Sequence, residues 1–204
     1  QQVVSGISIG AVYALLAVGY ALIYSVYNFT NWAFDAFMVV GAFVGFYALA
    51  SFHLPVWLAI TLAIVLTAAL AVLVETGACR PLRMRNAPRL FMMISAMGAN
   101  LAIVNLINLF FGGAFRKFPE ITAGTFNIGG VSIGKMDLFA GVFSFIVLGA
   151  LWFFLQRTKA GLAIRASSLD MTTAGIMGIN NNTVALVIFG ISGILSGVSG
   201  IFYG

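Results

Sequence analysis

The chain has 204 residues, of which 62% are hydrophobic and 7% are charged, and its mean hydropathy is +1.09. Soluble domains typically carry about 25% charged residues, so this composition excludes an ordinary water-soluble domain. Ten Lys and Arg against five Asp and Glu give a net charge of +5, and a single cysteine and a single histidine leave neither a disulfide framework nor a Cys/His zinc site.

Six apolar runs follow one another along the chain, and most charged residues lie between them. About 20 apolar residues are needed to cross a hydrocarbon core of ~30 Å. The sequence therefore predicts an all-α fold, a polytopic transmembrane helical bundle of about six spans that forms one domain over residues 1–204. The runs cover residues 3–26, 32–52, 55–74, 90–111, 138–155 and 183–204.

The join between the first two runs is unusually polar for a membrane segment. Asn31 and Asp35 lie there, and Asn100 lies inside the fourth run. Polar groups inside spans tend to mark transport pathways, and a helix break at membrane depth is tolerated only where it is buried or lines a cavity. Two alternatives remain open: Asp35 sits at headgroup level and stabilises a helix N-terminus, and the asparagines form interhelical hydrogen bonds.

Basic residues gather in two of the connections between the runs. The positive-inside rule places both connections in the cytoplasm, and basic residues that do not share one face exclude nucleic acid as a partner. Residues 112–137 and the connection around His53 are then expected on the outer side. The basic residues are Arg80, Arg83, Arg85 and Arg89 before the fourth run, and Arg157, Lys159 and Arg165 in the cytoplasmic loop 156–182.

Two further patterns concern packing and local structure. Small residues four apart predict close helix packing at Gly6/Gly10, Gly41/Gly45 and Gly193/Gly197. Residues 124–133 alternate apolar and polar side chains around Gly129 and Gly130, which predicts a small β-hairpin on the outer face between spans four and five.

The loop 156–182 contains a predicted amphipathic helix. Ser168 or Asp170 can serve as its N-cap, and Gly178 can end it. Such a helix binds either the membrane surface or another protein; because this one has no Lys or Arg, we expect it to dock in a protein groove. Small Ala174 and Gly178 would allow a close approach, and the apolar face is formed by Leu169, Thr173, Ile176 and Met177.

Enzymatic constellations are missing from the sequence. The five acids are scattered over different joins, and no Gly-rich loop ending in Lys-Ser or Lys-Thr could cradle a nucleotide phosphate. Transport or conduction, with no cofactor and no metal, is therefore the expected function.

The loop 156–182 resembles the cytoplasmic coupling loop of branched-chain amino acid ABC importer permeases, whose pattern is T-x-x-G-x-x-x-R-A followed by an acid, an alanine and G-I-N. Thr158, Gly161, Arg165-Ala166, Asp170, Ala174 and Gly178-Ile179-Asn180 match it. Glu75 with Arg80-Pro81-Leu82-Arg83 is similar to the family's E-x-x-x-x-R-P-L-R, and Gly6 to Leu15 resembles its opening G-x-x-x-G-x-x-Y-A-L. The resemblance covers almost the whole chain.

One departure from the family pattern concerns the substrate. Where the family has N-F-A-H-G followed by an acid, this chain keeps Asn31 and Ala33 but has Phe34, Asp35 and Ala36 in the last three places. The resemblance also extends to permeases for urea, short amides and other small solutes, so the transported molecule is expected to be a branched-chain amino acid or a related small solute.

The resemblance implies a multi-pass permease subunit in the bacterial inner membrane, with further spans beyond residue 204. Its implied partners are ABC ATPase subunits, a homologous second permease, an extracytoplasmic solute-binding protein, the substrate and membrane lipid. The competing interpretations are a stand-alone secondary transporter or channel with Asp35 as an ion or proton site, and a structural membrane scaffold. The candidate pathway residues are Asn31, Phe34, Asp35 and Asn100; the candidate ATPase-coupling residues are Leu169, Asp170, Thr173, Ala174, Ile176, Met177 and Gly178.

Overall fold

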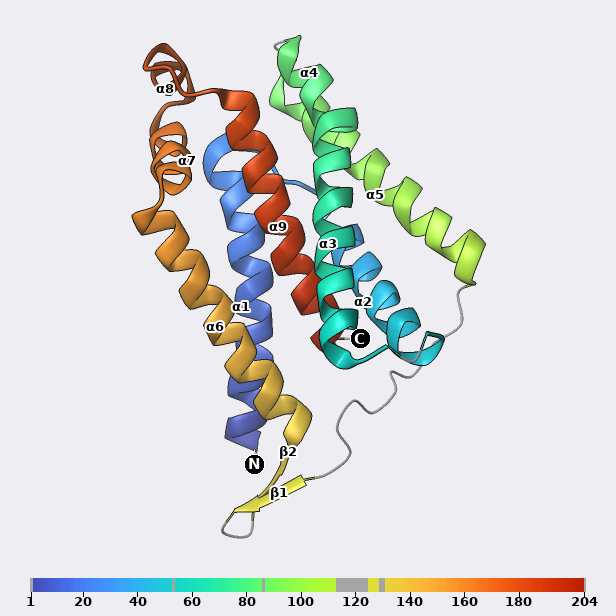
Figure 1. The fold of residues 1–204 in the computed structure, drawn as a ribbon. Helices are drawn as coiled ribbons and strands as arrows, with labels where there is room; N and C mark the ends of the chain where they lie inside the picture. The colour runs from blue at the N-terminus through green and yellow to red at the C-terminus, as the bar shows by residue number, and fades with distance from the viewer. Residues whose placement is uncertain (1, 53, 86, 113–124, 129–130, 204) are drawn as a thin grey trace.

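The computed structural model describes residues 2–52, 54–85, 87–112, 125–128 and 131–203, which form a helical bundle (Figure 1). The long helices are α1 (Gln2–Tyr27), α2 (Phe34–Ala50), α3 (Val56–Val74), α5 (Arg89–Phe111), α6 (Lys135–Arg157) and α9 (Asn181–Tyr203). A π-helical turn, η1 (Glu75–Cys79), and the short α4 (Arg80–Met84) continue α3. The remaining elements are α7 (Lys159–Leu169), α8 (Met171–Ile176) and the strands β1 (Thr125–Ile128) and β2 (Val131–Gly134).

Five helical segments of the described residues are long and apolar enough to cross a membrane, so the expected number of about six spans is corrected to five. The sixth apolar helix, α2, has only 17 residues. At 1.5 Å per residue it is about 26 Å long, shorter than a ~30 Å hydrocarbon core. The sequence pattern overestimated the length of this span, because the polar residues before Phe34 are not helical. The five segments are Ser5–Tyr27, Val56–Met84, Arg89–Phe111, Leu138–Arg157 and Asn181–Tyr203.

Helix α9 lies at the centre of the bundle, where it packs against α1, α2 and α3. Its buried residues include glycines and serines between larger apolar side chains, and at the glycines the neighbouring backbones come close. A Cβ atom added to Gly41 of α2 would lie 2.9 Å from the Cα atom of Gly197, and one added to Gly193 would lie 2.8 Å from the Cα atom of Ala68. Two of the three glycine pairs thus lie at helix contacts, as expected.

The third glycine pair does not lie at a contact within this chain. A Cβ atom added to Gly6 or Gly10 would meet nothing within 4 Å, and both residues are exposed. The expectation of close packing is therefore wrong for this pair among the described residues, because the side of α1 that carries it faces away from the bundle.

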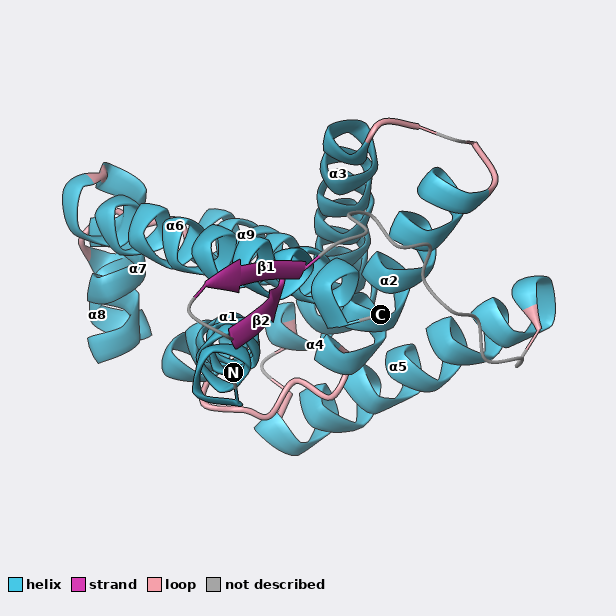
Figure 2. Ribbon diagram, turned by 90° about the horizontal axis from the view of Figure 1, so that it is seen from below, coloured by secondary structure: helices cyan, strands magenta, loops and turns pink. Residues whose placement is uncertain are grey.

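The two connections that carry the basic clusters lie at the same end of the bundle. Figure 1 shows α4 and α8 at this end, which we call the coupling end, whereas the start of α1 and both strands lie at the opposite end. In the perpendicular view of Figure 2, α5 stands on one side of the bundle and α6, α7 and α8 on the other. Two of the predicted spans lie between the two basic connections, so the predicted topology also places both connections at one end of the bundle.

The strands β1 and β2 pair antiparallel, with Phe126 opposite Ile133 and Asn127 opposite Ser132. Residues 129–130, on which the hairpin turn was expected, lie outside the described residues. The same holds for His53 and for residues 113–124 of the expected outer loop 112–137.

The packing of α9 predicts opposite effects for two glycine substitutions. We expect Gly193→Ala to lower the free energy of unfolding by about 1–3 kcal/mol, because the new methyl group meets the backbone of α3. Gly10→Ala, which adds the same methyl group in open space, should be neutral or slightly stabilising, since Ala favours helix over Gly. Thermal unfolding of the purified variants in detergent measures both, and equal stability of the two variants would contradict this account of the packing.

Candidate functional site

The connection between α1 and α2 is a buried break in helical structure. Phe29, Asn31 and Ala33 are each at most 2% exposed. Asn28 has φ = 51°, a left-handed conformation that Asn tolerates better than most residues, and it turns the chain out of α1. The Oδ1 atom of Asn31 accepts a hydrogen bond from the amide of Ala33 at 3.1 Å. Three residues of the non-helical connection are thus covered by protein, whereas Asn28 and Trp32 are exposed.

The four candidate pathway residues lie around this break. Phe34 is 5% exposed and its ring packs edge-on against that of Tyr20, whereas Asp35 is exposed on the surface of the chain. Asn100 comes from α5, and its Nδ2 atom donates to the carbonyl oxygen of Trp32 at 2.8 Å. The tertiary structure therefore brings residues of the second and fourth apolar runs together, with Asn31 and Phe34 inside the chain and Asp35 on its surface.

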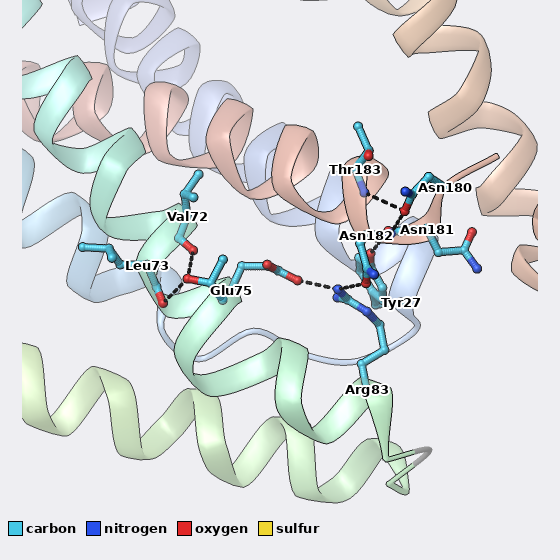
Figure 3. Close-up of polar contacts among 10 residues, drawn as sticks. Tyr27, Val72, Leu73, Glu75, Arg83, Asn180, Asn181, Asn182 and Thr183 are labelled. Atoms are coloured by element: carbon cyan, nitrogen blue, oxygen red, sulfur yellow. Dashed lines mark hydrogen bonds and ion pairs between the residues drawn. The ribbon is translucent and has the colours of Figure 1, made fainter.

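A second polar cluster lies at the coupling end, inside the bundle. The carboxylate of Glu75 is fully buried, and its Oε1 atom lies 2.6 Å from Nη2 of Arg83 (Figure 3). The same Nη2 atom donates to Oδ1 of Asn182 at 2.9 Å, and the guanidinium lies 5.3 Å from the ring centroid of Tyr27. Removing one partner of a buried ion pair typically costs about 3–5 kcal/mol, because the other charge stays buried without compensation.

The sequence analysis missed this ion pair. It placed Arg83 among the basic loop residues and Glu75 among several scattered acids, and it joined the two only as parts of the motif E-x-x-x-x-R-P-L-R, without a contact between them. The available signal was an acid at the end of an apolar run, because a buried carboxylate needs a cation nearby. The other two basic residues of interest are less buried: Arg80 is half-buried, and exposed Arg165 donates to Oε1 of Gln156 at 2.8 Å.

Two helices form in the loop 156–182, where the sequence predicted one. The hydroxyl oxygen of Thr158 accepts from the amide of Gly161 at 3.0 Å and caps α7, which the sequence analysis did not foresee. Asp170 caps α8: its Oδ1 atom accepts from the amide of Thr172 at 2.8 Å, and the hydroxyl of Thr173 donates to its other oxygen. These hydrogen bonds lower the pKa of Asp170 from its ordinary value, the hydroxyl of Thr173 contributing most.

The residues expected to face a partner divide into an exposed and a buried set. Leu169, Ile176 and Met177 are 90%, 81% and 78% exposed. Leu169, however, ends α7 and does not belong to α8, and Ala174 is buried within the chain, so it cannot provide the close approach to a partner that was expected. Gly178 has φ = 89°, which fits its expected place after the end of the helix.

Two grooves separate α8 from the neighbouring elements of the coupling end, and Arg83 lines both. One, of about 430 Å³, also involves Tyr27, Ser167 and Thr172. The other, of about 570 Å³, runs between α8 and the start of α9 and also involves Thr172 and Asn182. Among the described residues, no group of three or more His, Cys, Asp or Glu side chains could hold a metal ion.

The comparisons with known proteins agree on one family. Residues 2–204 match the family described as branched-chain amino acid transport system / permease component. The high-affinity branched-chain amino acid transport system permease protein BraD of Pseudomonas aeruginosa is 30% identical over 217 residues, which cover 100% of this chain and 70% of the relative. The corresponding protein LivH of Escherichia coli is 29% identical with the same coverage. A probable branched-chain amino acid transport permease protein LivH of Methanocaldococcus jannaschii is 30% identical over 91% of this chain and 60% of the relative. No solved structure matches the chain significantly.

The cap of α8 predicts a pH dependence of this helix. Because hydrogen bonds lower the pKa of Asp170, the stabilisation is present above the pKa of an unfolded Asp and is lost as the pH falls through the lowered value. We expect the hydrogen-exchange protection of residues 172–176, corrected for intrinsic exchange, to be constant near neutral pH and to fall below about pH 4. Asp170→Asn keeps a capping oxygen that does not titrate, so the same fall in this variant would contradict the prediction.

Proposed function

Because this chain belongs to the family of permease components of branched-chain amino acid transport systems, we propose that it forms the translocation pathway of an ATP-driven importer and couples it to cytoplasmic ATPase subunits. It is a multi-pass membrane transport subunit and not an enzyme. The proposed substrate is a branched-chain amino acid or a related small solute. A homologous second permease and an extracytoplasmic solute-binding protein complete the proposed assembly, in which the coupling end faces the cytoplasm.

The position of Asp35 supports its place on the pathway. It lies fifteen residues before the end of α2 at Ala50, hence ~22 Å along the helix, which is less than the ~30 Å thickness of the hydrocarbon core. A carboxylate that faced lipid at that depth would cost several kcal/mol. Since Asp35 is exposed on the chain, a water-filled pathway or a second permease suits it better than lipid. A carboxylate there can pair with the ammonium group of an amino acid.

The observation that carries the coupling role is the pair of helices at the coupling end with exposed apolar side chains. Leu169, Ile176 and Met177 project from α7, α8 and the turn that follows. Helix α7 carries exposed Lys159 and Arg165, but neither α8 nor this turn contains a Lys or Arg, so the α8 part of the segment lacks the basic face that favours anionic lipid surfaces. A hydrophobic groove on an ATPase subunit is the partner that suits this set of side chains.

If the exposed apolar side chains of α7 and α8 dock on an ATPase subunit, one of two matched leucine substitutions should disrupt the complex of permease and ATPase. We expect Leu169→Ser to abolish co-purification with the ATPase subunits and to reduce uptake at least tenfold, because it removes the most exposed apolar side chain of the docking segment. Leu109, in the last turn of α5 at the opposite end, is 77% exposed, so Leu109→Ser removes the same side chain away from the proposed interface. Normal co-purification and uptake in Leu169→Ser would rule out this docking site.

The pathway role predicts a change in substrate handling for Asp35→Asn. We expect normal assembly with the ATPase but at least a tenfold rise in KM for uptake of a branched-chain amino acid, because the pairing with the substrate's ammonium group is lost. Asn105→Ala serves as the control, since the side-chain amide of Asn105 is satisfied by its own helix at Leu101. Unchanged uptake kinetics would remove Asp35 from the pathway, whereas uptake by proteoliposomes driven by an ion gradient without ATP would favour the secondary-transporter alternative.

A further inference from the structure

The guanidinium of Arg83 joins three parts of the bundle that are far apart in the sequence. It pairs with Glu75, which begins the π-helical turn after α3, at 2.6 Å. It donates to the side chain of Asn182 in the first turn of α9 at 2.9 Å. It also lies over the ring of Tyr27, the last residue of α1 (Figure 3). One side chain therefore meets the coupling-end termini of three helices.

The start of α9 is also bonded to α8. The Nδ2 atom of Asn181 donates to the carbonyl oxygen of Met171, the first residue of α8, at 3.3 Å. The hydroxyl of Tyr27 donates to the carbonyl oxygen of Asn181 at 3.4 Å. A continuous series of polar contacts therefore runs from α8 through Asn181 and Asn182 to Arg83, and from there to Glu75.

The two grooves that Arg83 lines show where this series of polar contacts connects α8 to the rest of the bundle. They lie between α8 on one side and α4 and the start of α5 on the other, and α8 packs mainly against α7 and the start of α9. Arg83 lines both grooves at the point where they are bridged. Besides the direct packing of α9 against α3, Arg83 therefore provides a polar link from the start of α9 to the turn that follows α3.

The segment that this link reaches is itself irregular. Residues Glu75–Cys79 form a π-helical turn between α3 and α4, and π-turns within α-helices are frequent at functional sites. The hydroxyl of Thr76 donates to the carbonyl oxygen of Val72 at 2.9 Å beside this turn. Glu75 is fully buried, so a movement of Arg83 requires the carboxylate, and with it the end of α3, to follow.

We infer that Arg83 is a positioning residue that transmits the movement of α8 and the start of α9 to α3 through its ion pair with Glu75. The inference rests on the proposed ATPase coupling, because it assigns the route by which that coupling reaches the membrane spans. Arg83 acts through its neighbours and does not contact substrate in this account.

The decisive variant is Asn182→Ala, which removes the contact between Arg83 and α9 but leaves the ion pair with Glu75 in place. In proteoliposomes that contain the whole importer, we expect normal co-purification of the ATPase and normal ATP hydrolysis, but at least a threefold fall in substrate molecules transported per ATP hydrolysed. The KM for substrate should be unchanged, since the pathway itself is not altered. Thr183→Ala is the matched control, because Thr183 is the exposed neighbour of Asn182 on α9.

A second variant tests Arg83 itself. Arg83→Lys keeps a positive charge opposite Glu75 but replaces the planar fork that serves two partners by a single ammonium group. We expect the same fall in transport per ATP, with Arg85→Lys at an exposed neighbouring arginine as the control. If the Arg83→Lys variant does not assemble with the ATPase, the ratio of transport to ATP hydrolysis in Asn182→Ala decides whether the inference holds.

The outcomes separate this inference from the proposed function. An unchanged ratio of transport to hydrolysis in Asn182→Ala, with the ATPase bound, would overturn the role of Arg83 and leave the ABC permease assignment intact. If the wild-type chain neither co-purified with an ATPase nor required ATP for uptake, the proposed function and the route through Arg83 would both fail.

Discussion

The close approach of α9 to α2 and α3 is the contact on which the rest of the structure depends. Gly193 and Gly197 let the backbones of these helices come so near that no side chain fits between them. Lipid tails are as apolar as leucine, so helix association in a membrane relies on such close packing and on interhelical hydrogen bonds. The central position of α9 then determines where its two ends lie relative to the other helices.

The same helix also forms hydrogen bonds to α1 and α2, the helices on either side of the break. The hydroxyl of Ser192 donates to the carbonyl oxygen of Gly19 in α1 at 2.8 Å, and that of Ser196 donates to the carbonyl oxygen of Phe34 at 3.4 Å. Gly19 lies within α1 and Phe34 is the first residue of α2, so these hydroxyl groups add interhelical hydrogen bonds to carbonyl groups of both helices. The short α2, which begins with Phe34 and exposed Asp35, is therefore held in place by α9.

The start of α9 belongs to the coupling end. Asn182 contacts Arg83, and Asn181 contacts α8, so one end of the central helix meets both the buried ion pair and the short helix proposed to dock an ATPase. The close packing of α9 against α1, α2 and α3 allows it to transmit strain, because close-packed interiors have low compressibility. This combination of a closely packed central helix and a polar cluster at one end is well suited to the coupling proposed for the importer.

The sequence by itself determined the membrane-spanning class, five of the spans, the glycine contacts of α9 and the helix end before Gly178, because hydropathy and local backbone preferences are encoded within a few neighbouring residues. The family resemblance, drawn from local motifs, was confirmed by the match over residues 2–204. Only the tertiary structure decided that α2 is short, that Ala174 faces inward and that Gly6 and Gly10 have no neighbour among the described residues. It also decided the contacts of Arg83 with Asn182 and Tyr27, which depend on how α1, α4 and α9 are placed in space. Burial and pairing of such side chains arise from contacts between residues 99 positions apart, as with Arg83 and Asn182, and no local pattern contains that information.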